Sequence, residues 1–244
     1  MNTLPDLRLL DTCVWQSLCG PHRAFSLGTS TARRFAPGFS PIIAFADPVN
    51  PDWDALASIC APGEHFYCAA WQGVPPTGWS VDVDSAMSQL VWQGGMPETE
   101  ANPGWVALDA RSAPEMLDLA TRLQPGPFGL RTIELGDYLG YFDHGRLVSM
   151  AGERFWAGSF REISAVCTDP AYQGRGLARR LMLELIRRHQ HRGLTSFLHV
   201  MRDNLRARQM YERMGFVVYR ELGVRVVTRL ATSAAPTPAS LGHG

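Results

Sequence analysis

The chain has 244 residues, of which 45% are hydrophobic and 19% charged, and its 23 basic and 23 acidic side chains give a formal net charge of zero. This composition is typical of a folded globular protein, and it argues against a disordered chain and against a general nucleic-acid-binding protein. All 23 basic residues are arginine, which excludes lysine chemistry such as a Schiff base or the lysine of a P-loop.

Charge is distributed unevenly between the two parts of the chain. Residues 1–100 contain 4 arginines and 10 acidic residues, whereas residues 101–244 contain 19 arginines and 13 acidic residues. The second part is therefore expected to attract an anionic ligand. No stretch approaches the roughly 18 uncharged apolar residues of a membrane span, and the first residues lack the pattern of a signal peptide. We expect a soluble, cytoplasmic protein without a membrane partner.

The first 100 residues contain the pattern of a small β-α-β unit. Residues 42–46 predict a strand, Asn50 and Pro51 can begin a helix over residues 52–60, and the aromatic residues of 65–71 favour a second strand. Nothing in this region indicates a chemical activity, so the role of residues 1–100 stays open.

A Gly- and Pro-containing connector over residues 94–104 separates this region from a second domain over residues 101–230. Apolar patterns of strand and helix periodicity alternate in that domain. They predict an α+β fold in which helices flank a mixed, mostly antiparallel sheet. The expected strands are 105–110, 133–142, 146–151, 160–167 and 195–201 with a hairpin over 216–230, the expected helices are 112–123, 176–192 and 204–214, and the Ala/Ser/Pro-rich tail 231–244 is expected to be disordered.

The segment between the strand at 160–167 and the helix at 176–192 is suited to hold a phosphate. Gly174 and Gly176 remove side chains that would prevent a close approach, and the first amides of the following helix have no intrahelical acceptor. These donors and the helix dipole can bind an anion. A dinucleotide-binding fingerprint would need Gly or Ala where Arg179 stands, and a Walker loop would need lysine.

Two motifs in the correct order give this segment a family resemblance. Gln173-Gly-Arg-Gly-Leu-Ala178 matches the Q/R-x-x-G-x-G/A signature of the GNAT N-acetyltransferase superfamily, and Asn204-x-x-Ala-x-x-x-Tyr-Glu-x-x-Gly-Phe216 matches its C-terminal helix. The chain resembles most closely the branch that contains glycine N-acyltransferase-like proteins. The resemblance covers residues of about 103 to 230 and makes 101–230 the acetyltransferase domain, while residues 1–100 are open to being a degenerate copy of the same fold.

The resemblance implies how acetyl-CoA is bound. The strands at 160–168 and 195–201 are expected to splay apart and to admit the pantetheine arm, which pairs with the main chain of Val166 and Thr168. Gln173 opens the loop whose backbone amides hold the pyrophosphate, and Asn204 bonds the CoA arm. The loop amides are those of Gly174, Arg175, Gly176, Leu177 and Ala178.

The resemblance also assigns a general acid. Tyr211 stands where the family protonates the departing CoA thiolate. A phenol with a pKa of about 10 is protonated at neutral pH and can donate to a thiolate whose conjugate acid has a pKa of about 8.5.

A general base is needed because the attacking amine must lose a proton. Glu162 is the first candidate, since relatives often place a carboxylate near this position, and Glu153 and His199 are its rivals. A backbone amide at Val166 or Cys167 can stabilise the oxyanion. Cys167 itself is expected to be a core residue, because direct attack needs no acyl-enzyme.

These expectations describe an N-acyltransferase that moves an acetyl or short acyl group from acyl-CoA to a primary amine, an amino acid or a peptide. The alternative is an inactive CoA-binding or protein-interaction module with the same fold. Five cysteines without a C-x-x-C pair, and the lack of a ligand cluster, predict reduced thiols and no metal. Neutral overall charge predicts no nucleic-acid partner.

Overall fold

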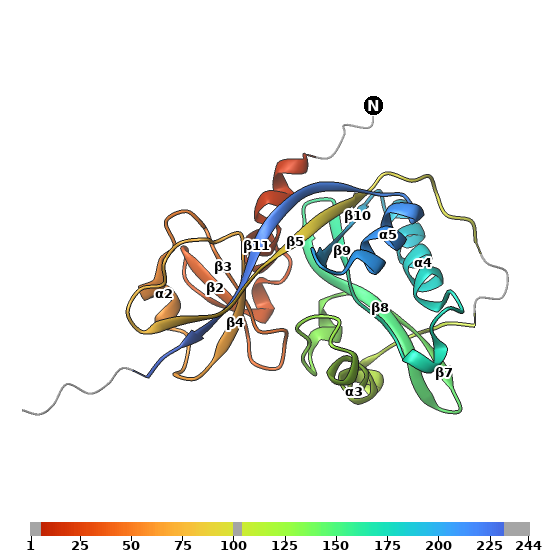
Figure 1. The fold of residues 1–244 in the computed structure, drawn as a ribbon, viewed down its shortest axis with the longest axis horizontal. Coiled ribbons are helices and arrows are strands. Elements are labelled where there is room, and N and C mark those ends of the chain that lie inside the picture. Colours follow the sequence, from red (N-terminus) through yellow and green to blue (C-terminus); the bar gives the residue numbers. More distant parts are fainter. Residues whose placement is uncertain (1–5, 100–103, 232–244) are drawn as a thin grey trace, which may run out of the picture.

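One curved sheet runs through the molecule (Figure 1). The computed structural model describes residues 6–99 and 104–231, and within them eleven strands follow the order β1-β2-β3-β4-β11-β5-β10-β9-β8-β7-β6. The pairs β3–β4 and β9–β10 are parallel and the other pairs antiparallel, so the predicted α+β fold with a mixed, mostly antiparallel sheet is confirmed. The strands are β1 Ser26–Gly28, β2 Ala32–Phe35, β3 Ile42–Phe45, β4 His65–Ala69, β5 Trp79–Trp92, β6 Val106–Ala107, β7 Tyr138–Asp143, β8 Arg146–Ala157, β9 Phe160–Thr168, β10 Thr195–Met201 and β11 Phe216–Arg229.

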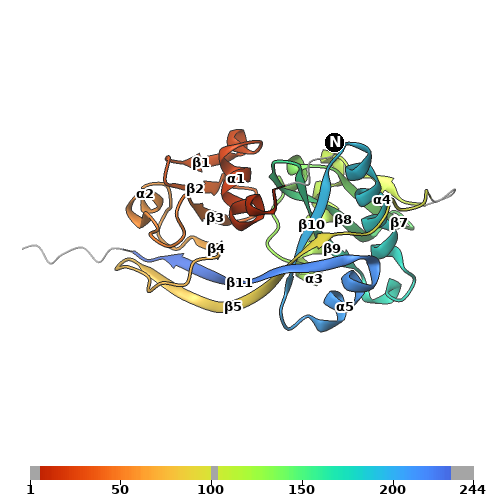
Figure 2. The ribbon, with the colours of Figure 1, turned by 90° about the horizontal axis from the view of Figure 1, so that it is seen from above.

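Helices cover both faces of this sheet. On one face α4 and α5 pack against Leu90 and Leu198, while on the other α3 packs against Met150 and Cys167 and α1 against Phe155. Figure 2 shows α1 and α5 on opposite sides of β11. The helices are α1 Cys13–Cys19, α2 Trp53–Ala57, α3 Ala113–Leu123, α4 Leu177–His191 and α5 Leu205–Met214, and short 3-10 helices span Leu7–Thr12, Arg23–Phe25, Ala110–Ser112, Thr132–Leu135 and Pro170–Tyr172.

Two 14-residue strands, β5 and β11, join the halves of the molecule. They pair along their whole length, and β11 also pairs with β4 while β5 also pairs with β10. The prediction of a hairpin over 216–230 is therefore wrong. Gly223, at the expected turn, lies in the ladder opposite Ala86, because β5, for which no strand was expected, supplies a partner for the full length of β11.

Smaller differences from the expected elements have local causes. The β-α-β unit of β3, α2 and β4 is confirmed, but Asp52 caps α2 by accepting from the amide of Ala55. Asn50 instead lies in a turn closed by Asp47, whose side chain accepts from the amide of Asn50. Strand β7 begins only at Tyr138, after a 3-10 turn.

The connector after β5 carries no regular structure at residues 93–99. The sheet nevertheless continues across the boundary proposed at residue 100, since β5 lies between β11 and β10, so the division into domains stays a prediction. The tail expected to be disordered lies outside the described residues from 232 onward. Among the described helices, none combines the length and the apolar character needed to cross a bilayer.

A buried histidine fixes α1 to the second half of the chain. The Nε2–H of His22 donates to the carbonyl of Leu135 at 3.0 Å, so Nδ1 accepts from the hydroxyl of Ser17 at 2.8 Å. The Ser17 oxygen in turn accepts from the amide of Trp156 at 3.1 Å. The neutral ring is complementary to these partners, and burial lowers the pKa of His22 to about 4.

This histidine makes stability dependent on pH. Its pKa is lower in the folded chain than the 6.5 of a free side chain, so the unfolded chain binds the extra proton between these values and stability falls as pH falls through that window. The loss is about 3 kcal/mol of unfolding free energy at pH values below 4. In urea unfolding between pH 7 and pH 4, His22→Gln should remove about this part of the pH dependence, while the exposed His144→Gln should keep it. An unchanged dependence in His22→Gln would contradict the assignment.

Candidate active site

Strands β9 and β10 separate after a short stretch of parallel pairing. Their register is Thr195 with Phe160, Ser196 with Arg161 and Phe197 with Glu162. Beyond these pairs, residues 163–168 and 198–201 do not pair with each other. The splay expected between the two strands is therefore present, and it leaves backbone donors and acceptors without a strand partner.

A bulge in β9 lies at this splay. Ser164 pairs with Gly152 and Cys167 with Met150, so two residues of β9 face a single residue of β8. Ala165 within the bulge has a φ of 54°, a left-handed conformation that is costly for a residue with a side chain. Such bulges redirect backbone groups near functional sites.

The backbone of Thr168 points toward the opening. The amide of Asp169 donates to the carbonyl of Val148 on β8 at 2.8 Å, and by strand alternation the groups of Thr168 face the opposite edge. The carbonyl of Thr168 already accepts from Nε2 of Gln173 at 3.2 Å. Val166 and Thr168 both line a cavity at the splay, and their pairing with pantetheine stays a prediction.

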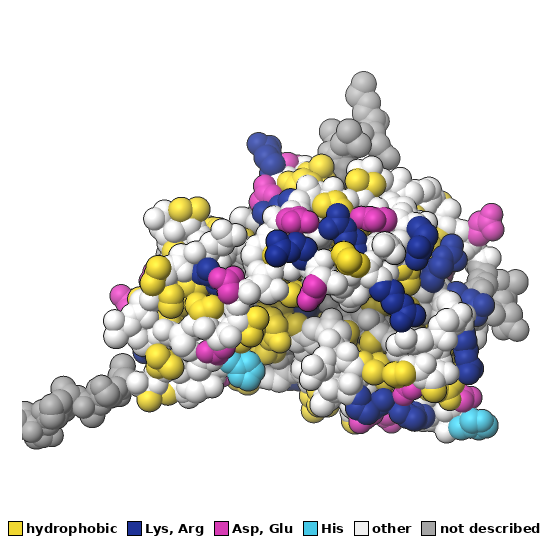
Figure 3. All heavy atoms as spheres, in the orientation of Figure 1, with side chains coloured by type: hydrophobic (Ala, Val, Ile, Leu, Met, Phe, Trp, Pro, Cys, Tyr) yellow, Lys and Arg dark blue, Asp and Glu magenta, His cyan; other side chains and the backbone are white. Residues whose placement is uncertain are grey.

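A cavity of about 850 Å³ extends from the splay across the sheet face that carries α1 and α3. Figure 3 shows the molecular surface hollowed between its two halves, with hydrophobic side chains beside the hollow. Pockets for small molecules usually measure about 300–1,000 Å³, and this cavity lies within that range. Five of the predicted site residues line it: Val166, Thr168, Gln173, Asn204 and Tyr211.

The loop after β9 presents a row of free amides beside Gln173. Gly174 and Gly176 have φ values of 78° and 75°, and no other atom lies within 4 Å of a Cβ built on either. The first backbone hydrogen bond of α4 runs from Arg180 to Gly176. Within the described part of the chain, the amides of residues 174–179 therefore donate to no protein acceptor. Together with the N-terminus of α4 they form a cradle for an anion.

The side chains around this cradle have defined partners. Arg175 donates to the carbonyl of Ala171 and stacks on Tyr172. Arg206 reaches Oε1 of Gln173 from α5 at 3.5 Å. Asn204 caps α5 through the amide of Ala207 at 3.1 Å, a role that leaves its amide nitrogen for another acceptor.

Tyr211 lies at the cavity wall opposite β9. It is buried, packs edge-on against Phe216, and its hydroxyl donates to no described residue. Burial raises the pKa of Tyr211 to about 12. The phenol therefore carries its proton at neutral pH and points to no competing acceptor.

Glu162 is a buried, paired carboxylate. Arg154 donates Nε and Nη2 to its two oxygens, both at 2.8 Å, and His199 contacts Oε1 through Nδ1 at 2.7 Å. Burial opposes ionisation, but the charge and hydrogen bonds of Arg154, joined by His199, hold the pKa of Glu162 down at about 2. A carboxylate so weakly basic and so fully engaged is poorly suited to remove a proton from an amine.

The same contacts determine which nitrogen of His199 is available. An ionised carboxylate only accepts, so Nδ1 of His199 carries the proton that is donated to Glu162. In the neutral ring Nε2 is then an acceptor, and it is buried without a hydrogen-bond partner among the described residues. The side chain is 6% exposed and His199 lines the cavity. An unpartnered buried acceptor is unusual in a folded protein.

The remaining candidates lie elsewhere or serve the core. Glu153 is buried and binds Nε2 of His189 at 2.8 Å, and it does not line the cavity. Cys167 is buried in the core under α3, and burial raises the pKa of its thiol to about 12. Within residues 6–99 and 104–231, no three His, Cys, Asp or Glu side chains gather as a metal site.

Two features of the site were not predicted from the sequence. No buried cation was predicted beside Glu162, yet Arg154 neutralises that carboxylate inside the protein. The contribution of β4, β5 and β11 to the site was left open, and Tyr67, Val83 and Val226 from these strands line the cavity.

The fold and the motifs of this chain recur in known proteins. The model of the acetyltransferase (GNAT) family matches residues 110–216. A crystal structure from Novosphingobium aromaticivorans, assigned to acetyltransferases of the GNAT family, is 33% identical with a TM-score of 0.84 and covers 91% of this chain and 99% of its own. A GCN5-related N-acetyltransferase from Kribbella flavida has a TM-score of 0.58 at 13% identity, over 94% of this chain and 98% of its own, and shares the fold.

A shorter match involves a curated protein. The N-alpha-acetyltransferase RimI of Mycobacterium tuberculosis is 44% identical over 55 residues, which are 22% of this chain. The match spans 34% of the length of RimI.

Proposed function

The chain belongs to the GNAT family of acetyltransferases, and we propose that it moves an acetyl group from acetyl-CoA to a primary amine by direct attack. The observation that carries this proposal is one cavity that contains a strand splay, a protonated phenol and an unpartnered imidazole nitrogen. The placement of the chain near the glycine N-acyltransferase-like branch stays a prediction from the motifs.

The donor fits the groups that the protein leaves free. The amides of residues 174–178 would bind the pyrophosphate of CoA, as expected for donors at a helix N-terminus. The pantetheine arm would lie between β9 and β10, where the backbone at Val166 and Thr168 lacks a strand partner. Asn204, on the cavity wall, can donate its side-chain amide to the same arm.

The chemistry follows from the two groups that flank this arm. The amine nitrogen forms a bond to the thioester carbonyl carbon, and the backbone amide of Val166 is placed to stabilise the oxyanion. When the carbon–sulfur bond breaks, the phenol of Tyr211 gives its proton to the thiolate. Nε2 of His199 accepts the proton that the amine loses. Solvent then restores the proton of Tyr211 and takes up that of His199.

Glu162 and Arg154 act behind His199 as positioning residues. The carboxylate holds the imidazole in the tautomer that leaves Nε2 free, and Arg154 keeps that carboxylate ionised. In this arrangement His199, rather than Glu162, is the proposed base. The same arrangement explains why the Arg154–Glu162 pair is retained in the interior, although burial of charge is costly.

Tyr211→Phe tests the general acid. Removal of the hydroxyl should lower kcat for release of CoA thiol by about 100- to 10,000-fold. The affinity for CoA should stay within a few-fold, because the ring still packs against Phe216. Stopped assays of free thiol with a reactive amine measure kcat, and calorimetry measures the affinity for CoA. Turnover at the wild-type rate would remove Tyr211 from the reaction.

His199→Ala tests the general base. The change should lower kcat/KM for the amine by about 100- to 10,000-fold, and added imidazole should restore part of it by entering the space that the ring leaves. The exposed His144→Ala is the matched control and should behave as the wild type. A lowered activity without rescue in a protein of unchanged melting temperature would point to a structural role for His199.

A further inference from the structure

The cavity continues from the splay onto β4 and β5 of the first half of the chain and onto β11, which lies between them in the sheet. Across β4, β11 and β5 the residues Tyr67, Val226 and Val83 lie side by side in register, and Ala69, Val224 and Ser85 form the next row. All six line the cavity. We refer to these two rows as the acceptor floor. Met87 and Met201 pair with each other, line the cavity, and join the acceptor floor to the splay.

No acidic side chain lines any part of this cavity among the described residues. The basic side chains that line it are Arg154 and His199, and both are hydrogen-bonded to Glu162. Arg154 donates two hydrogen bonds to that carboxylate, so its charge is already compensated. A ligand with a second cation would find no carboxylate here, and a ligand carboxylate would find no uncompensated cation.

The strands beneath the floor cannot pair with an extended peptide. Strand β4 lies between β3 and β11, β11 between β4 and β5, and β5 between β11 and β10. Their backbone groups are therefore used in the sheet, and a peptide cannot add as a further strand. Peptide amides on this floor would lose their hydrogen bonds to water without replacement.

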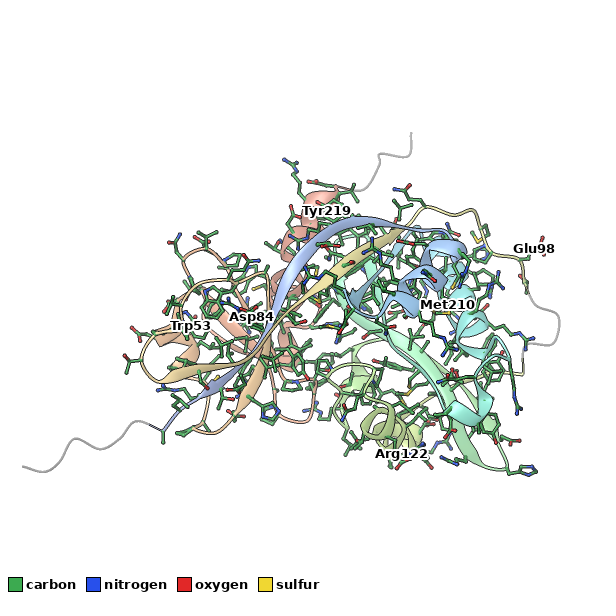
Figure 4. The ribbon with its side chains drawn as sticks, viewed as in Figure 1. Trp53, Asp84, Glu98, Arg122, Met210 and Tyr219 are labelled. Atoms are coloured by element: carbon green, nitrogen blue, oxygen red, sulfur yellow. The ribbon has the colours of Figure 1, made fainter. Side chains whose placement is uncertain are left out.

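Beside the floor, β5 turns a charged side chain to the other face of the sheet. On β5 the neighbour of Val83 and Ser85 is Asp84, which turns to the other face and forms an ion pair with Arg225 at 2.7 Å. Figure 4 marks Asp84 where β5 and β11 cross. The alternation along β5 thus separates a charged outer face from an apolar inner face.

We propose that the acceptor floor binds the body of the acceptor, and that the acceptor is a small primary amine with an uncharged apolar group, such as an arylalkylamine. The inference rests on the proposed function, because it takes the splay end of the cavity as the place of reaction. The amine nitrogen lies toward His199 and the apolar group covers Val226 and Val224. The hydroxyls of Ser85 and Tyr67 are the polar groups that the floor offers.

A panel of acceptors with acetyl-CoA tests this inference. We expect kcat/KM for 2-phenylethylamine to exceed that for ethylamine by about 10- to 100-fold, the ratio that burial of an aromatic group gives. It should also exceed kcat/KM for 1,4-diaminobutane, glycine, phenylalanine and a short peptide with a free N-terminus. Thiol release that favours any of these four would leave the proposed function intact and overturn the inference.

Substitution at Ser85 locates the binding site. Ser85→Asp places a carboxylate on the floor and should raise KM for 2-phenylethylamine at least tenfold while lowering KM for 1,4-diaminobutane. Asn has the size of Asp but no charge, so Ser85→Asn is the matched control. It should change both KM values less than threefold. The Kd for CoA should stay constant in both variants. Equal effects of the Asp and Asn variants would overturn the inference.

Equilibrium binding separates this inference from the proposed function. Calorimetry on the protein loaded with CoA should give a Kd for 2-phenylethylamine at least tenfold below that for ethylamine, even if no acceptor releases thiol. Selective binding without thiol release would overturn the proposed function and leave the inference about the acceptor floor intact. Equal Kd values, or a preference for longer acyl-CoA without selectivity among amines, would assign the floor to another group and overturn the inference.

Discussion

The separation of β9 from β10 is the constraint on which the rest of the structure depends. Parallel pairing ends at Glu162 and Phe197, and the bulge with Ala165 in a left-handed conformation turns the backbone of β9 toward the opening. A sheet interrupted in this way exposes peptide groups that must find other partners. The free amides at the start of α4 lie next to this opening along the chain, and together the two sets of groups form the site that we propose for CoA.

Beyond β10 the sheet continues through β5 and β11 into the strands of the first half of the chain. Strands β5 and β11 cross from one half to the other, and their inner face forms the apolar floor that continues from the splay. The buried triad of Arg154, Glu162 and His199 lies where the two parts of the cavity meet. Its net charge is near neutral, which lets an imidazole acceptor persist in an apolar cavity.

The sequence predicted the parts of the site that depend on local patterns. The loop with Gly174 and Gly176 and the position of Asn204 follow from turn and capping rules, and the structure places them as expected. Long-range pairing was not predictable in this way: β5 alternates Val and Asp at residues 81–84, yet nothing local says that it accompanies β11 for 14 residues. The environment of Glu162 also depends on three strands meeting, so its burial and its pairing with Arg154 could not be read from its neighbours.

A crystal structure of the complex with CoA tests the central claim most directly. The account predicts the diphosphate within hydrogen-bonding distance of the amides of residues 174–178, the pantetheine arm between β9 and β10, and the thiol beside the hydroxyl of Tyr211. A structure in which CoA lies outside the splay, or in which β9 and β10 pair to their ends, would contradict it.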